Sequence, residues 1–315
     1  MQMSFMRLSY GDDATRSNSI DRGRAAGLLV APTFAAEETT RMIRSPIPSS
    51  GEMLPVIGLG TAGPFDVGSS ATERQSLDEV MALFPKSGAK LIDTSPMYGR
   101  AEGVIGESAS KLKLRDSLFL ATKVWTTGRE QGIKQMERSL ELLGTKKLDL
   151  IQVHNLIDTA THLATLREWK KEGRVRYIGI THHTEGSQAE VASILEKEKV
   201  DFVQINYSLM EREAEKRVFP VAKDRGVAVI VNRPFGRGDL FNRVRGKALP
   251  DWAVEFDCKS WAQFFLKWII AYPVVTCAIP ATGNPHHMED DLSGGMGRLP
   301  NEQLRQRMVE FVAGL

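Results

Sequence analysis

The sequence lacks most of the features that mark specialised protein classes. Only two of its 315 residues are cysteines, Cys258 and Cys277, which is too few for a disulfide framework and typical of small buried side chains. No apolar run approaches the roughly 18 residues of a membrane span. The formal charge of +2 and the lack of a long Lys/Arg block argue against a nucleic-acid partner. With 42% hydrophobic and 25% charged residues, the composition indicates an ordinary globular protein.

The first 43 residues differ from the rest and are expected to form an extension. Residues 1–21 are polar and without periodicity, which is typical of disorder. Arg22 and Arg24 then precede an apolar stretch that ends at Ala36 and is followed by acidic residues. That order is the order of a secretory signal, although the arginines are separated by a glycine. The default prediction is a cytoplasmic protein; a working signal between Arg22 and Ala36 would place it in the periplasm or outside the cell.

From about residue 52 onward, short apolar runs alternate with amphipathic stretches such as residues 131–143 and 163–171. Eight strands separated by helices over about 260 residues predict an α/β protein of the (β/α)8 barrel type, with one domain at residues 44–315. A doubly wound open sheet competes with this reading, but no G-x-G-x-x-G follows the first run. The predicted strands span residues 55–61, 90–94, 118–124, 148–155, 175–181, 201–206, 227–232 and 275–280.

Four chemically active residues lie at or just after predicted strands. Asp93 ends the second strand, Lys123 lies near the end of the third, His154 ends the fourth, and Tyr98 follows Asp93 in the next loop. In such a barrel the carboxyl ends of the strands form the mouth that carries the active site. The pattern therefore predicts that an acid, a phenol, an amine and an imidazole meet there. Together they can make a proton donor for the reduction of a carbonyl group.

Several separated motifs, in a fixed order, resemble those of the aldo-keto reductases. They are GLGT at residues 58–61, DTSPMYG at 93–99, EGVIG at 102–106, ATKVW at 121–125, QVHN at 152–155, GRVRYIGIT at 173–181, VQINYS at 203–208 and IPATGNP at 279–285. The resemblance covers about residues 47–315. It implies an NAD(P)H-dependent carbonyl reductase on a barrel, which binds its cofactor without a Rossmann domain.

The chemistry of carbonyl reduction gives each of the four residues a role. Hydride addition builds negative charge on the carbonyl oxygen, which needs a proton, and a free tyrosine with a pKa of about 10 is a slow acid. We therefore expect Tyr98 to be the proton donor and Lys123 to lower its pKa. Asp93 is expected to keep Lys123 charged, and His154 to orient the substrate oxygen. Taken singly, each residue also has an ordinary structural explanation; the four together favour catalysis.

The nicotinamide end of the cofactor is expected to follow the family with two departures. The family holds the nicotinamide amide with a Ser-Asn pair after the fifth strand and a Gln in the sixth. Here Thr181 keeps the hydroxyl and Gln204 the amide, but the residue after Thr181 is a histidine. Asn232 replaces the usual stacking tyrosine, and Arg233 or Arg237 could bind the pyrophosphate. The predicted contacts are Gly60, Thr61, Thr181, Gln204, Asn232, Arg233, Phe235 and Gly236.

The adenosine end departs further from the family. Members that use NADPH commonly carry Lys-Ser and a later Arg that bind the 2′-phosphate, whereas this chain has Ala281, Thr282 and His287. Thr282 and Asn284 can donate hydrogen bonds, and Asp291 suits adenine or ribose. The sequence thus predicts NADP(H) as the favoured cofactor, with NAD(H) also accepted.

The substrate side of the mouth is predicted from two positions and from the loops. Trp125 should wall the pocket, and Ala62 should widen it, because many relatives have a tryptophan after GLGT. The loops after the fourth and seventh strands read as short, which suggests an open pocket for small aldehydes or ketones. The side chains of the histidine pairs at 182–183 and 286–287 are expected to point apart because they are chain neighbours, so no metal is expected.

Two rival functions remain open at this point. Some proteins of this fold bind a nicotinamide cofactor but serve as regulatory subunits of membrane channels, with little turnover. A phosphate-sugar aldolase on the same barrel would instead use a lysine Schiff base and no nicotinamide. The oligomeric state is open, with a monomer as the default.

Overall fold

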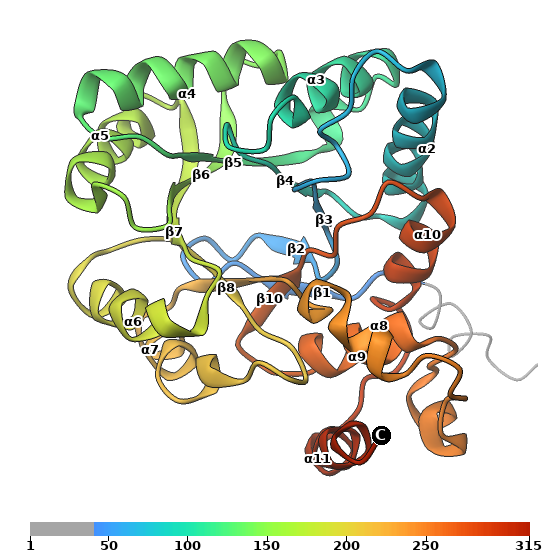
Figure 1. The fold of residues 1–315 in the computed structure, drawn as a ribbon. Coiled ribbons are helices and arrows are strands. Elements are labelled where there is room, and N and C mark those ends of the chain that lie inside the picture. The colour runs from blue at the N-terminus through green and yellow to red at the C-terminus, as the bar shows by residue number, and fades with distance from the viewer. Residues whose placement is uncertain (1–40) are drawn as a thin grey trace, which may run out of the picture.

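The computed structural model describes residues 41–315, which form a barrel of eight parallel strands surrounded by helices (Figure 1). The backbone N–H of Gly58 donates to the carbonyl of Ala278 at 2.9 Å, and that of Gly60 to Pro280 at 2.8 Å, so the first and last strands meet. The prediction of a (β/α)8 barrel is therefore confirmed. The strands are β3 (Leu59–Gly60), β4 (Leu91–Asp93), β5 (Phe119–Val124), β6 (Leu148–His154), β7 (Val175–Thr181), β8 (Phe202–Asn206), β9 (Ala228–Asn232) and β10 (Val275–Ala278).

The helices follow the apolar periodicity of the sequence. In α4, for example, Met136, Leu140 and Leu143 are buried against the sheet, and Gly144 ends the helix in the left-handed conformation with φ 62°. The helices are α2 (Ala71–Ser87), α3 (Ala101–Lys111), α4 (Arg129–Leu143), α5 (Thr159–Lys171), α6 (Gln188–Lys197), α7 (Val218–Arg225), α8 (Asp239–Arg243), α9 (Trp261–Ile270), α10 (Pro285–Ser293) and α11 (Glu302–Ala313).

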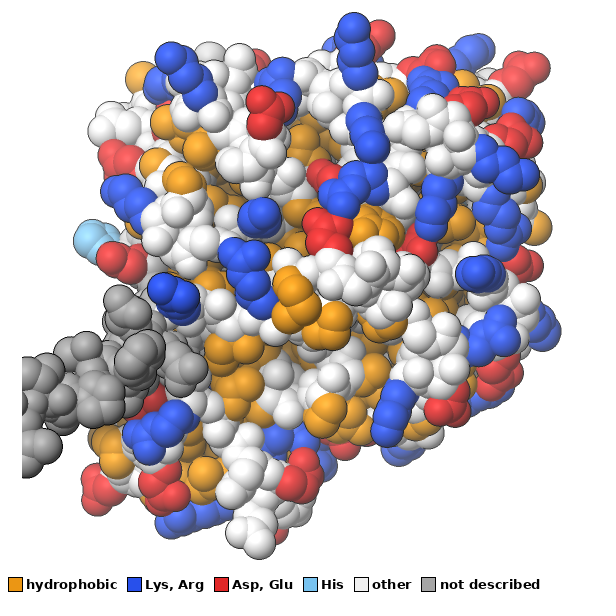
Figure 2. Space-filling model, turned by 180° about the vertical axis from the view of Figure 1, so that it is seen from behind, with side chains coloured by type: hydrophobic (Ala, Val, Ile, Leu, Met, Phe, Trp, Pro, Cys, Tyr) orange, Lys and Arg blue, Asp and Glu red, His pale blue; other side chains and the backbone are white. Residues whose placement is uncertain are grey.

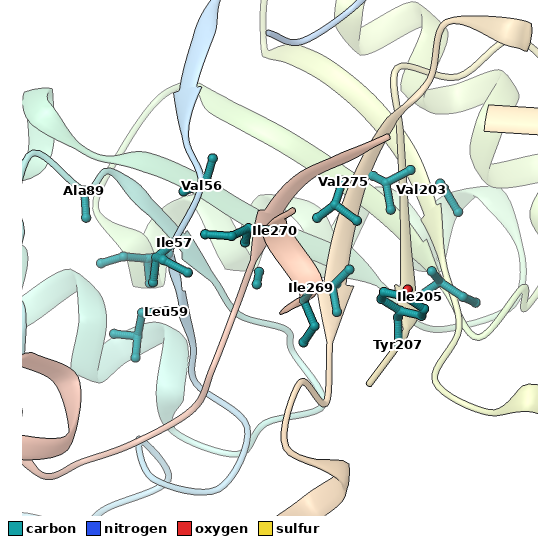
Figure 3. Packing of buried hydrophobic residues seen from close by; sticks show 14 of the residues in the cluster. Val56, Ile57, Leu59, Ala89, Val203, Ile205, Tyr207, Ile269, Ile270 and Val275 are labelled. Carbon is teal, nitrogen blue, oxygen red and sulfur yellow. The ribbon is translucent and has the colours of Figure 1, made fainter. Parts of the chain in front are cut away.

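The core has an outer layer between strands and helices and an inner layer within the barrel. In the outer layer, Ile269 and Ile270 of α9 share one cluster with Val275 of β10 and with Val203 and Ile205 of β8 (Figure 3). The inner layer holds large side chains from the first residues of the strands, including Phe119 and Phe202. Cys258 and Cys277 are both buried and free, as expected. The strands that carry the site residues are thus packed on both faces, by the outer layer on one face and by the inner layer on the other.

A hairpin that the sequence did not predict closes the amino-terminal end of the barrel. It consists of β1 (Arg44–Pro46) and β2 (Met53–Pro55), which pair antiparallel. Ile47 and Leu54 are buried in the inner layer, and the hydroxyl of Tyr177 on β7 donates to Ser50 Oγ at 2.8 Å. Pro55 therefore belongs to this hairpin and not to the first barrel strand. The hairpin fills the end of the barrel opposite the carboxyl ends of the strands.

The charge distribution on the surface and the apolar character of the helices concern the predictions about nucleic-acid and membrane partners. On the face shown in Figure 2, Lys and Arg side chains lie among Asp and Glu side chains, without a purely basic patch. Within residues 41–315, no helix combines the length and the apolar character that a bilayer crossing requires. The signal-like segment at residues 22–36 lies outside the described residues, so the location of the protein in the cell stays a prediction.

Deletion of residues 1–40 is expected to leave melting temperature and turnover unchanged. Deletion through Ile43 should lower the melting temperature by roughly 5 °C or more, because it also removes the buried Met42 and its contacts. Met42 is 7% exposed, and the backbone of Ile43 bonds to Gly295 and Val56. Thermal unfolding of the two truncated proteins beside the full chain measures this. Equal melting temperatures for both truncations would show that this contact contributes little.

Candidate active site

Asp93, Lys123, His154 and Tyr98, here called the tetrad, come together at the carboxyl ends of β4, β5 and β6. Asp93 and His154 are the last residues of their strands, and Tyr98 lies in the loop from β4 to α3. Asp93, Tyr98 and His154 border a cavity of about 760 Å³, while Lys123 is fully buried behind them. The convergence predicted from the strand pattern is what the barrel produces.

The carboxylate of Asp93 and the ammonium of Lys123 form a buried ion pair with every partner in place. Lys123 Nζ lies 2.6 Å from Asp93 Oδ2 and donates to the carbonyl of Thr94 at 2.7 Å. The other carboxylate oxygen of Asp93 accepts from Gln204 Nε2 at 2.8 Å and from Gln152 Nε2 at 3.2 Å. Burial is the largest single influence and acts to lower the pKa of Lys123, but the charges and hydrogen bonds of Asp93 and Tyr98 together outweigh it, and the pKa lies above its ordinary value. Lys123 is therefore a cation.

Tyr98 lies next to this cation, with Lys123 Nζ 4.9 Å from the centre of its ring. Burial raises the pKa of Tyr98, and the charge of Lys123 offsets this only in part, so the pKa stays above its ordinary value. Burial is the larger influence, so the net shift is upward, although Lys123 acts to lower the pKa of Tyr98 as expected. The phenol keeps its proton at neutral pH and can donate it.

His154 stands beside Tyr98, with the two rings edge to face and 5.9 Å apart. Burial, together with the charge of Lys123, lowers the pKa of His154 to about 2. The imidazole is thus neutral, and it can donate one hydrogen bond and accept another. Its Nδ1 lies 3.0 Å from Ser95 Oγ.

Thr181, Gln204 and Asn232 line one wall of the cavity and share a polar network. Thr181 Oγ1 donates to Gln204 Oε1 at 3.1 Å, and Asn232 Nδ2 donates to the carbonyl of His182 at 3.1 Å. Asn232 Oδ1 is buried and has no partner among the described residues. A buried acceptor without a donor is costly, so this oxygen is suited to a ligand N–H.

The arginines after β9 lie at the same cavity. Arg233 and Arg237 both line it, with φ of 53° and 61°, and Arg233 Nη1 donates to the carbonyl of His183 at 2.7 Å. Phe235 also lines the cavity, whereas Gly236 only turns the chain there with φ 55°. Burial, and then the charge of Arg237, lower the pKa of Arg233. The two like charges repel each other, and an anion between them would relieve this.

The loop after β9 is longer than the sequence indicated. It runs from residue 233 to residue 260, includes α8, and brings Phe241 into the cavity wall. The short turns of this loop have no regular apolar periodicity, so the sequence pattern did not predict an ordered segment here. The loop after β6 is short, at residues 155–158, as expected.

Gly60, Thr61 and Ala62 also line the cavity, and Thr61 Oγ1 donates to the carbonyl of Asp93 at 2.9 Å. His183 also lines the cavity, and its ring stacks on that of His182 with 5.2 Å between the ring centres, so the expectation that this pair points apart is wrong. The position of His183, two residues after the end of β7, was the available signal. The described residues contain no group of acidic, histidine or cysteine side chains that could hold a metal ion.

Some predicted contacts lie outside the lining of this cavity. Trp125 is 38% exposed, and its backbone N–H donates to Gln135 Oε1. Asn284 Oδ1 caps α10 by accepting from the N–H of His286 at 2.9 Å, and its own N–H donates to Thr282 Oγ1. The others are His287, which is exposed on α10, and Asp291, which is buried there. These α10 residues follow Ala281, which does line the cavity.

Comparison with known proteins decides the family. The model of the aldo/keto reductase family matches residues 56–307. The chain belongs to the aldo/keto reductase family. It is accordingly an NAD(P)H-dependent oxidoreductase with the family's barrel.

Relatives of this aldo/keto reductase agree with that assignment. It is 28% identical over 250 residues to the methylglyoxal reductase YeaE of Escherichia coli, covering 77% of this chain and 86% of that protein. It is 29% identical over 217 residues to the aldo-keto reductase YhdN of Bacillus subtilis, covering 64% of this chain and 63% of that protein. Both are named as reductases, which favours an enzyme over a channel subunit. An aldo-keto reductase from Klebsiella pneumoniae with NADPH has the same fold, with a TM-score of 0.71 at 24% identity, covering 86% and 96% of the two chains.

Proposed function

We propose that this aldo/keto reductase reduces small aldehydes and ketones, with Tyr98 as the proton donor. The observation that carries the proposal is the buried Asp93–Lys123 ion pair directly beside the Tyr98 ring. A buried ion pair is weak evidence for stability, since desolvation offsets most of its attraction. A fully buried cation next to a phenol is instead suited to a step in which the phenol becomes negative.

The residues of the cavity fit a nicotinamide cofactor. The unpartnered Oδ1 of Asn232 can accept from the carboxamide N–H₂, and the hydroxyl of Thr181 stands in the same wall. Arg233 and Arg237 would hold the pyrophosphate by guanidinium hydrogen bonds. Gln204 is proposed at the nicotinamide as well, with its remaining N–H, since its other groups are already bonded to Asp93 and Thr181.

The tetrad then acts on the carbonyl oxygen. When bound, the reduced nicotinamide supplies the hydride to the carbonyl carbon. His154 donates a hydrogen bond to the oxygen and holds it near Tyr98. The O–H bond of Tyr98 breaks as its proton passes to that oxygen, and the resulting phenolate is stabilised by the ammonium of Lys123. Asp93 keeps Lys123 protonated throughout.

The size of the cavity suits small carbonyl compounds. Its 760 Å³ must hold part of the cofactor as well as the substrate, and Ala62, Met97 and Phe241 leave an apolar side for the substrate. Because a relative is named as a methylglyoxal reductase, short 2-oxoaldehydes are the first candidates. Trp125 is proposed at the outer rim of this pocket.

A panel of aldehydes and ketones, offered with NADPH and with NADH, tests the proposal. We expect cofactor oxidation at 340 nm with equimolar alcohol as product, fastest for short 2-oxoaldehydes. Tight cofactor binding without turnover of any carbonyl compound would favour a regulatory role instead. A lysine adduct trapped by borohydride, without nicotinamide dependence, would indicate the aldolase chemistry.

Cofactor preference is expected to be modest, in favour of NADP(H). His287 is proposed near the 2′-phosphate, with Thr282, Asn284 and Asp291 around the adenosine. His287→Arg should raise the ratio of kcat/KM for NADPH to that for NADH by about tenfold, because a charge-assisted hydrogen bond contributes roughly 1.5–3 kcal/mol. Steady-state kinetics with both cofactors measures the ratio.

His286→Arg is the matched control, because His286 is exposed like His287 but lies one position away on α10 and so points in another direction. An unchanged ratio for His287→Arg would mean that the phosphate is bound elsewhere, with Arg233 and Arg237 as the next candidates.

A further inference from the structure

Ser95 lies between the two side chains that face the substrate oxygen. It is fully buried in the loop from β4 to Tyr98, and its carbonyl accepts a hydrogen bond from the N–H of Tyr98 at 2.9 Å. Its hydroxyl oxygen accepts from the N–H of Met97 at 3.2 Å and lies 3.0 Å from His154 Nδ1. One residue thus contacts both the loop that carries Tyr98 and the ring of His154.

The hydrogen bonds of Ser95 can be counted atom by atom. A serine hydroxyl has one proton to donate and two lone pairs to accept with, and the N–H of Met97 occupies one of the lone pairs. If Nδ1 of His154 carried the proton, it would take the second lone pair, and the hydroxyl proton of Ser95 would have no acceptor among the described residues. A buried donor without an acceptor is costly. If the hydroxyl donates to Nδ1, every group of Ser95 is satisfied.

The second arrangement fixes the other nitrogen of the ring. A neutral imidazole has one N–H, so an Nδ1 that accepts leaves the proton on Nε2. Nε2 has no hydrogen-bond partner among the described residues, and His154 borders the cavity. A donor is therefore presented where the carbonyl oxygen of the substrate needs one. The opposite tautomer would present a lone pair to that oxygen and repel it.

We propose that Ser95 is a positioning residue for carbonyl reduction, which holds His154 as the tautomer with its proton on Nε2. This inference rests on the proposed function of His154 as the group that orients the substrate oxygen. Ser95 itself touches neither the substrate nor the reacting atoms; it acts through the ring. Because it also bonds the N–H of Met97, it ties the orientation of this ring to the loop on which Tyr98 stands.

The tautomer can be observed directly in the wild-type protein. Two-bond ¹H–¹⁵N spectra of ¹⁵N-histidine-labelled protein at pH 7 distinguish a protonated ring nitrogen from an unprotonated one, and His154→Phe identifies the resonances among those of the six histidines. We expect an unprotonated Nδ1 and a protonated Nε2. A protonated Nδ1 would overturn the proposal, whatever the enzyme turns over.

Kinetics of Ser95→Ala provide the second measurement. We expect kcat to fall about tenfold, with the Kd of the nicotinamide cofactor unchanged, since one hydrogen bond to the ring is lost. In the His154→Phe background the same substitution should cost little more, because there is no tautomer left to hold. An equal loss in both backgrounds would show a merely structural role and overturn the proposal.

Ser208→Ala is the matched control for this variant. Ser208 is also fully buried after a barrel strand, and its hydroxyl likewise accepts backbone N–H bonds, from Met210 and Glu211, but it contacts no tetrad residue. It should leave kcat and the His154 spectrum unchanged. The spectrum of the wild type decides the tautomer even if Ser95→Ala fails to fold. Near wild-type turnover by Tyr98→Phe would instead refute the proposed function and leave the tautomer result standing.

Discussion

Tyr98→Phe is expected to lower kcat by roughly 10²–10⁴-fold, which is the usual contribution of a positioned proton donor. The substitution removes only the hydroxyl, so the ring still packs against His154 and the cavity keeps its shape. The Kd of the cofactor should stay within about twofold of the wild-type value, because the predicted cofactor contacts are on other strands. Turnover of a short aldehyde and cofactor fluorescence titration measure the two quantities.

Phe241→Leu is a suitable control for this measurement, because Phe241 lines the same cavity but carries no proton. It should change KM more than kcat. If Tyr98→Phe kept near wild-type kcat, another group would have to supply the proton. The proposed role of Lys123, to stabilise the phenolate of Tyr98, would then also be wrong.

Asp93→Asn is expected to remove turnover and also to destabilise the fold by about 3–5 kcal/mol at pH 7, because it leaves a buried charge without its partner. Lys123 is 0% exposed, and an asparagine cannot neutralise its ammonium. The same substitution weakens the bonds that Gln152 and Gln204 donate to this carboxylate. Urea unfolding at several pH values measures the loss.

The pH dependence of this loss follows from Lys123. In the wild type its pKa is raised, so the pair stabilises the fold fully below the ordinary lysine pKa of about 10.4 and loses this effect as the pH rises through the raised value. In Asp93→Asn the effect of the carboxylate is gone, and burial, the largest influence, lowers the pKa of Lys123, so the variant should gain stability as the pH rises. The two proteins should differ less at pH 10 than at pH 7.

Glu168→Gln provides the control, because it removes an exposed ion pair. The side chain of Glu168 is 47% exposed and that of its partner Arg129 is 51% exposed. The urea midpoint of this variant should match that of the wild type, since exposed pairs contribute little. A pH-independent loss for Asp93→Asn would show that Lys123 is not the group responsible.

The positions of the eight strands and the meeting of the tetrad could be predicted from the sequence. Both depend on one regularity: buried parallel strands are continuous apolar runs, and their carboxyl ends share one face of the barrel. Once Asp93, Lys123 and His154 are placed at strand ends, their neighbourhood follows without knowledge of any distance.

Other features depend on how deeply a side chain is buried and on the direction in which it points, and a sequence pattern contains neither. The raised pKa of Tyr98 results from how many atoms cover it, and only a folded chain determines that number. Trp125 has the spacing of a strand residue, yet its side chain is partly exposed and outside the cavity lining. The Oδ1 of Asn284 caps α10, a role that the sequence pattern did not indicate. Ser95 gave no signal, since a serine in a turn is ordinary.

The hairpin of β1 and β2 has a practical consequence for the use of this enzyme. Because it covers the end of the barrel opposite the catalytic mouth, a surface or a fusion partner attached ahead of Met42 would be held at the closed end. The mouth formed by the loops around Tyr98 and Arg233 would then face away from the support. Immobilisation through the amino terminus should therefore preserve access for both cofactor and substrate, whereas attachment through the loop after β9 should obstruct it.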